Sequence, residues 1–231
     1  MIKEAVILVG GLGTRLRSVI SELPKCMAPV AGKPFLYYII NHLEKAGIQK
    51  FIFSAGYKNE IIEKYLRKKT TINYQLSVEK EPLGTGGAIK FAIAKSTEKN
   101  TLIVNGDTLF SINIAMLSAS HKAFNADCTL SLKPMHNFER YGVVELNSDG
   151  SIQSFKEKKA YKAGDINGGV YALNVPRFLN EDLPEKFSFE KDYLEKYFDK
   201  SKMYGVVQDE YFIDIGIPED YERAQTELKN K

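Results

Sequence analysis

The first apolar segment of the chain and the glycine-rich turn directly after it constrain the fold most strongly. Residues 5–9 are apolar, rich in β-branched types and too few for a buried helix, so they predict a strand buried on both faces. Three glycines follow between positions 10 and 13, where an open α/β sheet binds ligands and where bare backbone N–H groups can surround an anion. Thr14, Arg15 and Arg17 add a hydroxyl and two positive charges. The turn therefore predicts phosphate binding.

Two common phosphate-binding loops do not fit this turn. A P-loop needs four residues between its glycines and then Gly-Lys-Ser/Thr, and residues 11–15 do not have that spacing. The dinucleotide fingerprint Gly-x-Gly-x-x-Gly requires its third glycine where this chain has Leu16. The second predicted strand also ends at residues 54–56 without a carboxylate for a ribose. These departures disfavour a P-loop protein and a nicotinamide-dependent oxidoreductase.

Length and composition narrow the class of protein further. The chain has 231 residues, of which 44% are hydrophobic and 26% charged, as expected for one sizeable soluble domain. A net charge of +3, with both signs interspersed, disfavours nucleic acid as a partner. Cys26, Cys128 and the three histidines (His42, His121, His136) have no spacing typical of a disulfide scaffold or a zinc site. No signal peptide or membrane span is recognisable, so a cytoplasmic location is expected, without a membrane partner.

Strand and helix patterns alternate after the first turn. Residues 35–47 and 59–68 carry apolar side chains at helical spacing, and residues 50–56 and 72–78 are typical of strands. Helices between successive strands make the strands parallel. The sequence therefore predicts an α/β fold, a Rossmann-like doubly wound sheet that is mixed but mostly parallel, with helices on both faces.

The second half of the chain has a different rhythm. The patterns predict a buried strand at 101–105 and a helix at 112–124. Short runs of alternating apolar and polar residues follow and predict a small antiparallel excursion from the sheet; they lie at 127–133, 142–146 and 151–156. Further patterns predict strands at 170–173 and near 211–214, and helices at 175–179, 189–198 and 219–228. We expect a single domain over 1–231, with a nucleotide-binding half (1–125) and a sugar-binding half (126–231). No hexapeptide repeat of a C-terminal β-helix is present.

Two carboxylates are placed to hold a metal ion. Asp107 follows the predicted strand at 101–105, and Asp214 follows an apolar run and is close to Gly216. Because parallel strands present their carboxyl ends at one edge, both carboxylates are expected to converge above the first glycine-rich turn. Mg²⁺ commonly takes one or two carboxylates together with phosphate oxygens. The alternative is that Asp107 caps a helix and Asp214 fixes a turn.

Several separated motifs resemble those of one enzyme family, the sugar-1-phosphate nucleotidylyltransferases. Residues 10–16 are followed by Leu-Pro-Lys and Met-Ala-Pro-Val at 23–30, and the second glycine-rich loop, Glu-Pro-Leu-Gly-Thr-Gly-Gly-Ala-Ile, spans 81–89. The resemblance covers nearly the whole chain and is greatest to the heptose-1-phosphate guanylyltransferases. Cys26 and Lys159 stand where that family has prolines. On its own, the second loop would indicate only a helix-entry turn.

The resemblance implies a reaction and a set of site residues. GTP and a D-glycero-D-manno-heptose 1-phosphate would give GDP-heptose, a glycan precursor, and pyrophosphate, with Mg²⁺ as cofactor. Catalysis would depend on Arg15, Lys25 and Asp107, and the metal would bind Asp107 and Asp214. The nucleotide would contact Leu8, Gly10, Gly11, Gly13, Thr14, Arg15, Glu79, Pro82, Gly84, Thr85 and Gly106. The sugar phosphate would contact Gly142, Glu157, Lys158 and Asn167.

The base and the rival functions rest on weaker signals. Guanine presents adjacent N–H donors, so a carboxylate or backbone carbonyls should face them. Of the two nearby carboxylates, Glu79 is favoured over Glu81 by its position before the glycines. A hexose-1-phosphate nucleotidylyltransferase is the alternative within the family. A non-catalytic nucleotide-sugar sensor is disfavoured because Lys25, Asp107 and Asp214 are all present. Whether the chain forms a homo-oligomer stays open.

Overall fold

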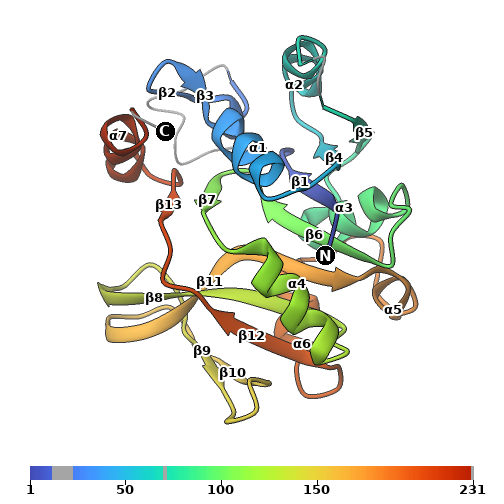
Figure 1. The fold of residues 1–231 in the computed structure, drawn as a ribbon, viewed down its shortest axis with the longest axis vertical. Coiled ribbons are helices and arrows are strands. Elements are labelled where there is room, and N and C mark those ends of the chain that lie inside the picture. The colour runs from blue at the N-terminus through green and yellow to red at the C-terminus, as the bar shows by residue number, and fades with distance from the viewer. Residues whose placement is uncertain (12–22, 70–71, 230–231) are drawn as a thin grey trace.

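A central sheet organises the protein. The computed structural model describes residues 1–11, 23–69 and 72–229, and over this part of the chain seven strands form one sheet (Figure 1). Their order across the sheet is β12-β8-β11-β6-β1-β4-β5. These strands are β1 (Glu4–Leu8), β4 (Lys50–Ala55), β5 (Tyr74–Val78), β6 (Asn100–Asn105), β8 (Cys128–Phe138), β11 (Tyr161–Asn174) and β12 (Met203–Val207).

One strand of this sheet is reversed. β1 is parallel to both of its neighbours, β4 and β6, and β4 is parallel to β5. β11 is antiparallel to β6 and to β8, whereas β12 is parallel to β8. Among the seven strands that the structure describes in this sheet, β11 alone therefore runs against the others. The mixed, mostly parallel sheet expected from the sequence is confirmed. Strands from both predicted halves share this sheet, and a boundary near residue 125 stays a prediction.

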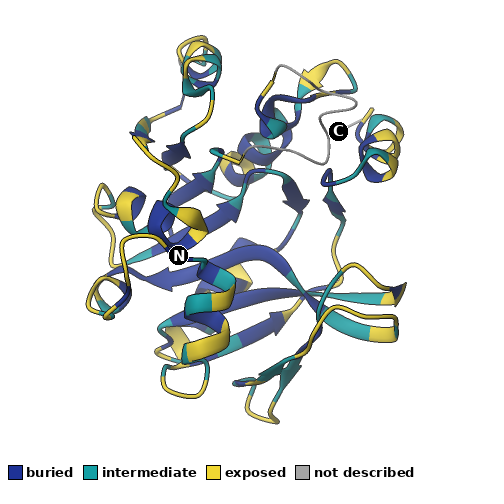
Figure 2. Ribbon diagram, turned by 180° about the vertical axis from the view of Figure 1, so that it is seen from behind, coloured by how far each residue is buried: buried dark blue, intermediate teal, exposed yellow. Residues whose placement is uncertain are grey.

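Helices cover both faces of the sheet. In β1, Ala5 and Ile7 join a buried core with α1 and α4, which lie in front of the sheet in Figure 1, whereas Val6 joins a core with α3 on the other face. Figure 2 shows the buried central strands and the more exposed outer faces of the helices. The helices are α1 (Phe35–Lys45), α2 (Asn59–Leu66), α3 (Gly84–Ile93), α4 (Ile114–Ala123), α5 (Val175–Leu179), α6 (Glu195–Tyr197), α7 (Pro218–Glu227), the 3₁₀ turn η2 (Lys25–Met27) and the π-helix η3 (Phe189–Leu194). None of the described helices combines the length and the apolar character needed to cross a bilayer.

The run at 127–133 does not belong to an antiparallel excursion. It is the first half of β8, which continues to Phe138 and runs in the direction of β1. The apolar alternation ends before Pro134, so the sequence pattern gave too early an end. β12 pairs with β8 only as far as Leu132. Pro134 therefore lies on a free edge of β8, where a missing N–H is tolerated.

β11 and β12 also differ from the expected pattern. Residues 167–169 lie inside β11, next to a register shift, and not at the start of a strand. β12 was not expected, because its five residues include Gly205 and are too short for a clear alternation. A Cβ at Gly205 would lie 2.6 Å from Leu132 and 2.7 Å from Leu146, so this glycine lets β12 pack closely. The expected hairpin is confirmed as β9 (Val144–Leu146) and β10 (Ile152–Phe155).

The sequence predicted that Asp214 follows a strand of the central sheet, and this prediction is wrong. Asp214 ends β13 (Phe212–Asp214), which pairs antiparallel with β7 (Thr108–Phe110) in a separate two-stranded ribbon. The backbone N–H of Ile215 donates to the carbonyl oxygen of Asp107 at 3.0 Å, a usual length for such a hydrogen bond. A second ribbon joins β2 (Pro29–Val30) to β3 (Lys33–Pro34). The β7–β13 ribbon is therefore what brings the two aspartates together.

His121 links α4 to the sheet through buried hydrogen bonds. Its Nδ1 lies 2.8 Å from Thr129 Oγ1 and its Nε2 lies 3.2 Å from Asn100 Oδ1. Burial, and to a smaller extent the charge of Arg177, lower the pKa of His121 to about 4, although Asp127 opposes the shift. The folded protein therefore keeps this imidazole neutral at pH values where the unfolded chain binds a proton.

We expect this histidine to make the protein less stable in mild acid. Between pH 6.5 and pH 4 the unfolded state binds more protons, so the free energy of unfolding falls by up to about 1.4 kcal/mol per pH unit from this group. Urea unfolding from pH 7.5 to pH 4.5 should show a shallower decline in His121→Gln than in the wild type. The exposed His136 provides the control, His136→Gln. Equal declines in wild type and His121→Gln would contradict the assignment.

Candidate active site

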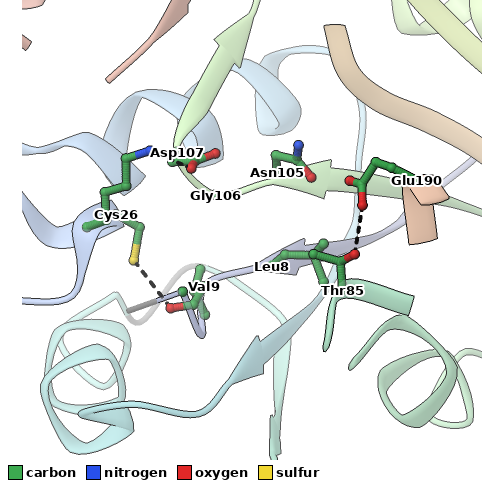
Figure 3. Close-up of a pocket in the computed structure, with 10 residues that line it drawn as sticks. Leu8, Val9, Cys26, Thr85, Asn105, Gly106, Asp107 and Glu190 are labelled. Carbon is green, nitrogen blue, oxygen red and sulfur yellow. Dashed lines mark hydrogen bonds and ion pairs between the residues drawn. The ribbon is translucent and has the colours of Figure 1, made fainter. Parts of the chain in front are cut away.

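A cavity opens at the carboxyl ends of β1 and β6, the edge at which an open α/β sheet is expected to bind its ligand (Figure 3). Its walls combine the strand ends, the η2 turn, the start of α3 and one residue of η3. The described residues that line it are Leu8, Val9, Gly11, Lys25, Cys26, Thr85, Asn105, Gly106, Asp107 and Glu190. Of the predicted site residues, Leu8, Gly11, Lys25, Thr85, Gly106 and Asp107 therefore share one cavity.

Lys25 lies between two carboxylates. Its Nζ is 2.6 Å from Asp107 Oδ2 and 3.6 Å from Asp214 Oδ1, and its side chain is 14% exposed. The preceding Pro24 starts a 3₁₀ turn closed by a 2.8 Å hydrogen bond from Met27 N–H to the Pro24 carbonyl. Cys26 and Met27 are buried and anchor this turn, which leaves the Lys25 ammonium at the cavity wall.

Asp107 is held close to the end of β1 by the glycine before it. Gly106 N–H donates to the Leu8 carbonyl oxygen at 3.0 Å, and a Cβ at position 106 would lie only 2.3 Å from that oxygen. Any side chain at this position would therefore push the two strand ends apart. Asp107 does not cap a helix, because β7 follows it directly.

Asp214 is the more buried of the two carboxylates. Burial first, and then the charge of Asp107, raise its pKa, whereas Lys25 acts in the opposite direction. The hydroxyl of Tyr141 donates to its Oδ2 at 3.3 Å. Its Oδ1 is buried and accepts no hydrogen bond from the part of the chain that the structure describes. That oxygen faces Lys25, so one acceptor position remains open toward the ammonium group.

This pair of carboxylates suits a divalent cation. Oxygen ligands are those that Mg²⁺ prefers, and two carboxylates are sufficient when phosphate oxygens and water complete the shell. Within residues 1–11, 23–69 and 72–229, no group of three or more Asp, Glu, His or Cys side chains gathers at a common point. The donor set therefore fits a cation shared with a phosphate ligand and not a site made by the protein alone.

The first glycine-rich turn is only partly described. Gly10 packs against β4, where a Cβ would lie 3.0 Å from Gly56 N, whereas Gly11 faces open space in the cavity. Gly13, Thr14 and Arg15 lie outside the described residues. A bare backbone position at Gly11 is what close approach of a phosphate requires.

The second glycine-rich loop packs against the C-terminal half of the chain. Gly84 has a φ of +72°, and a Cβ there would lie 2.5 Å from the Phe187 carbonyl oxygen. Cβ atoms at Gly86 and Gly87 would likewise collide with the Phe187 ring and the Glu185 carbonyl oxygen. These contacts give the glycines a packing role, and nucleotide contacts at Pro82 and Gly84 stay predictions.

Glu79 supports the same loop. Its Oε2 accepts a 2.9 Å hydrogen bond from Leu83 N–H. Burial raises the pKa of Glu79, although this hydrogen bond and one from Ser54 oppose the shift. Its Oε1 would lie 3.6 Å from a Cβ at Gly10, so the carboxylate is next to the first glycine-rich turn. This position is compatible with the predicted contact to the base.

The predicted sugar-side residues are not all in the cavity. Gly142 packs on the Lys156 backbone, where a Cβ would lie 2.3 Å from the carbonyl oxygen, and Glu157 and Lys158 are exposed. Asn167 Nδ2 donates to the Tyr171 hydroxyl at 2.8 Å, and its Oδ1 accepts from Gly169 N–H at 3.1 Å. None of the four predicted residues lines the described cavity, so their contacts to a sugar stay predictions.

Four lining residues were missed by the sequence analysis, and one of them, Val9, was expected only as part of the first strand. Cys26 directs its Sγ toward the Val9 carbonyl at 3.9 Å, and burial raises the pKa of its thiol to about 12, so it is a packing residue. Asn105 is the last residue of β6 and precedes Gly106. A polar residue at the end of a buried strand, next to the predicted Gly106 and Asp107, was a signal that could have identified it. Glu190 lies in a segment predicted only as a helix, and nothing in its sequence context indicates the cavity.

Comparison with known proteins places this chain in a family. The nucleotidyl transferase family model matches residues 4–231. The chain is 56% identical to a D-glycero-α-D-manno-heptose 1-phosphate guanylyltransferase of Aneurinibacillus thermoaerophilus, over 98% of this chain and 99% of that protein. An enzyme of the same name from Campylobacter jejuni is 45% identical over 94% and 96% of the two chains. The crystal structure of HddC from Yersinia pseudotuberculosis complexed with GMP-PN superimposes with a TM-score of 0.89 at 37% identity, covering 99% of this chain and all of that one. The chain belongs to the nucleotidyl transferase family.

Proposed function

We propose that the protein transfers a guanylyl group from GTP to D-glycero-α-D-manno-heptose 1-phosphate, giving GDP-heptose and pyrophosphate. The 56% identity over nearly the full length of a relative with that activity in its name carries the choice of substrates. The GMP-PN complex of HddC supports a guanine nucleotide. The cavity supports the chemistry, because a lysine and two carboxylates meet beside a glycine-rich turn.

The reaction needs two anions to meet. An oxygen of the sugar phosphate attacks the α-phosphorus of GTP, the bond from that phosphorus to the pyrophosphate oxygen breaks, and no covalent enzyme intermediate forms. The protein's main contribution is to hold the reactants in line and to neutralise their charge. Lys25 would stabilise the charge that builds up on the α-phosphate, and the turn containing Gly10, Gly11 and Arg15 would hold the triphosphate.

The carboxylates need a cation when the substrates bind. Asp107 and Asp214 would repel a triphosphate across the cavity, and the single charge of Lys25 does not balance both of them. We infer that these two residues hold Mg²⁺, which when bound supplies charge neutralisation between the two phosphate groups. Tyr141 would fix the orientation of Asp214 through the hydrogen bond to its Oδ2.

The remaining site residues complete the proposal. Glu79 would accept hydrogen bonds from guanine, and Leu8, Gly106 and Thr85 would line the nucleotide's path through the cavity. Lys158 would meet the sugar phosphate, and Glu157 and Asn167 would bind sugar hydroxyls. We place the reaction in the cytoplasm, and its product would enter glycan assembly.

Pyrophosphate release over a matrix of substrates tests the proposal. GTP, ATP, CTP, UTP and dTTP should each be combined with heptose, mannose and glucose 1-phosphates. We expect the highest kcat/KM for GTP with the heptose 1-phosphate. A higher value for a hexose 1-phosphate, or for another base, would replace the proposed reaction with the hexose alternative.

Lys25→Ala should lower kcat far more than it weakens GTP binding. Loss of one oriented donor to a developing oxyanion typically lowers turnover by a factor on the order of 10²–10³. Steady-state kinetics and GTP titration would separate the two effects, with Lys33→Ala as the control because Lys33 is exposed. A melting curve is needed as well, since Asp107 and Asp214 lose their shared partner. A variant with weaker GTP binding but an unchanged kcat would make Lys25 a binding residue only.

Asp107→Asn and Asp214→Asn should each raise the Mg²⁺ concentration needed for half-maximal activity, by about 10-fold or more, because each removes one charged ligand. Turnover measured against Mg²⁺ concentration would show the shift, and chelation should abolish wild-type activity. The exposed Asp199 supplies the control, Asp199→Asn. Folded variants with an unchanged Mg²⁺ requirement would contradict the shared metal site.

Glu79→Gln should reduce the preference for GTP over UTP. A neutral amide can still accept the Leu83 N–H, but it loses the charge-assisted contacts to guanine, which are worth roughly a factor of 10 in kcat/KM. The exposed neighbour Glu81 gives the matched control, Glu81→Gln. Unchanged discrimination in Glu79→Gln would remove Glu79 from the base-binding residues.

A further inference from the structure

One end of the cavity carries two polar side chains, Asn105 and Glu190, to which the proposed mechanism gives no chemical task. Thr85, which the proposal places along the nucleotide's path, lines the same end. Figure 3 shows Asp107 and Glu190 on opposite sides of Asn105, so the cavity has one end with the Lys25–Asp107 pair and a second acidic end. Glu190 is the first candidate for a role because it is charged and comes from a segment far away in the sequence.

Glu190 is held rigidly, but only through one of its oxygens. Its Oε2 accepts a hydrogen bond from Thr85 Oγ1 at 2.8 Å and a longer one from Ser188 Oγ at 3.3 Å. Thr85 Oγ1 in turn accepts from Phe189 N–H at 2.8 Å, so its proton is directed at Glu190. The other oxygen, Oε1, accepts no hydrogen bond from any residue that the structure describes. The carboxylate is therefore oriented and keeps one unused acceptor beside the cavity.

The backbone around Glu190 is also unusual. Residues 189–194 form a π-helix, a rare conformation that often occurs at functional sites. Phe189 and Tyr193 on this segment are fully buried and fix it against the sheet. The buried neighbours hold the segment in place, and Glu190 is left as its cavity-lining residue.

Charge decides what can bind at this end. A carboxylate repels phosphate groups, which the Lys25 end and a bound cation attract instead. A carboxylate without a cationic partner is, however, a strong acceptor for hydroxyl groups. Glu190 therefore suits a neutral, hydroxyl-bearing part of a substrate whose phosphate lies at the other end of the cavity.

The neighbours of Glu190 connect this end to β11, the strand that carries Asn167. Burial raises the pKa of the Tyr171 hydroxyl, and the nearby charge of Glu190 adds to this effect. The same hydroxyl accepts a hydrogen bond from Asn167 Nδ2. Gly169 leaves room for the Asn105 amide, because a Cβ there would lie 2.8 Å from Asn105 Nδ2. The polar end of the cavity is thus continuous with residues of the predicted sugar side.

We propose that Glu190 Oε1 accepts hydrogen bonds from hydroxyl groups of the sugar 1-phosphate, on the part of the sugar away from its phosphate, and so determines which sugars are used. This inference rests on the proposed function. Thr85 then acts as a positioning residue for Glu190, and Asn105 offers a neutral donor and acceptor next to it.

Steady-state kinetics of Glu190→Gln test the proposal, with the sugar 1-phosphate and GTP varied separately. Gln keeps the shape and can still accept the Thr85 hydroxyl, but it loses the charge. We expect the KM for the heptose 1-phosphate to rise by about 10-fold, the order expected for one charge-assisted hydrogen bond, with the KM for GTP within about 2-fold of wild type. The exposed Glu195 gives the matched control, Glu195→Gln. Glu190→Asp, which keeps the charge, serves if the Gln variant fails to fold.

Deoxy analogues of the heptose 1-phosphate identify the contact. The difference between wild type and Glu190→Gln should disappear for the analogue that lacks the bonded hydroxyl, as in a double-mutant cycle. Unchanged KM values for the sugar, or equal rises for both substrates, would assign Glu190 to the fold or to the nucleotide and overturn the proposal. Wild-type enzyme without activity on any sugar 1-phosphate would instead refute the proposed function, and this result is distinct because it requires no variant.

Discussion

The position of the Lys25 ammonium between Asp107 and Asp214 is the interaction on which the site depends. Three elements meet there, namely the η2 turn, the end of β6 and the end of β13. Without a cation, two carboxylates that share one neighbouring ammonium group, one of them largely buried, would raise the free energy of the folded state. Lys25 therefore pairs with the same two carboxylates that we propose as metal ligands, so in this proposal one side chain gives both structural support and catalytic charge.

The sequence predicted the parts of the fold that depend on local patterns. Apolar alternation and helical spacing located β1, β4, β6, α1 and α2, because each element buries a regular stripe of side chains. The sequence patterns failed where the pairing of a strand depends on partners that are distant in the sequence. β12 is a strand because it lies beside β8, and β13 leaves the central sheet because it pairs with β7. Asp214 consequently reaches the predicted neighbourhood by a route that no local pattern indicates.

The candidate site shows the same division. Lys25 and Asp107 stand in recognisable motifs, and the structure brings both to one cavity. Glu190 could not have been found, because only the packing of η3 on the start of α3 brings it there, about one hundred residues along the chain from Thr85. The second glycine-rich loop has a further reason for its composition. Its glycines let residues 185–187 pack closely against the loop. In the sequence, glycines required for packing cannot be told apart from glycines required for binding a ligand.

That close approach has a consequence for how such proteins can diverge. The loop at 83–87 and the segment at 185–190 are joined by hydrogen bonds between Phe187 and the backbone of Leu83 and Gly86, and by the Thr85–Glu190 contact. A larger side chain in the loop would have to be matched by a displaced backbone in the segment. The two stretches therefore have to be inherited as a pair, and exchanging only one of them between relatives would produce a chain with mismatched halves. Changes in the size of side chains in the loop should accordingly appear together with substitutions in the segment.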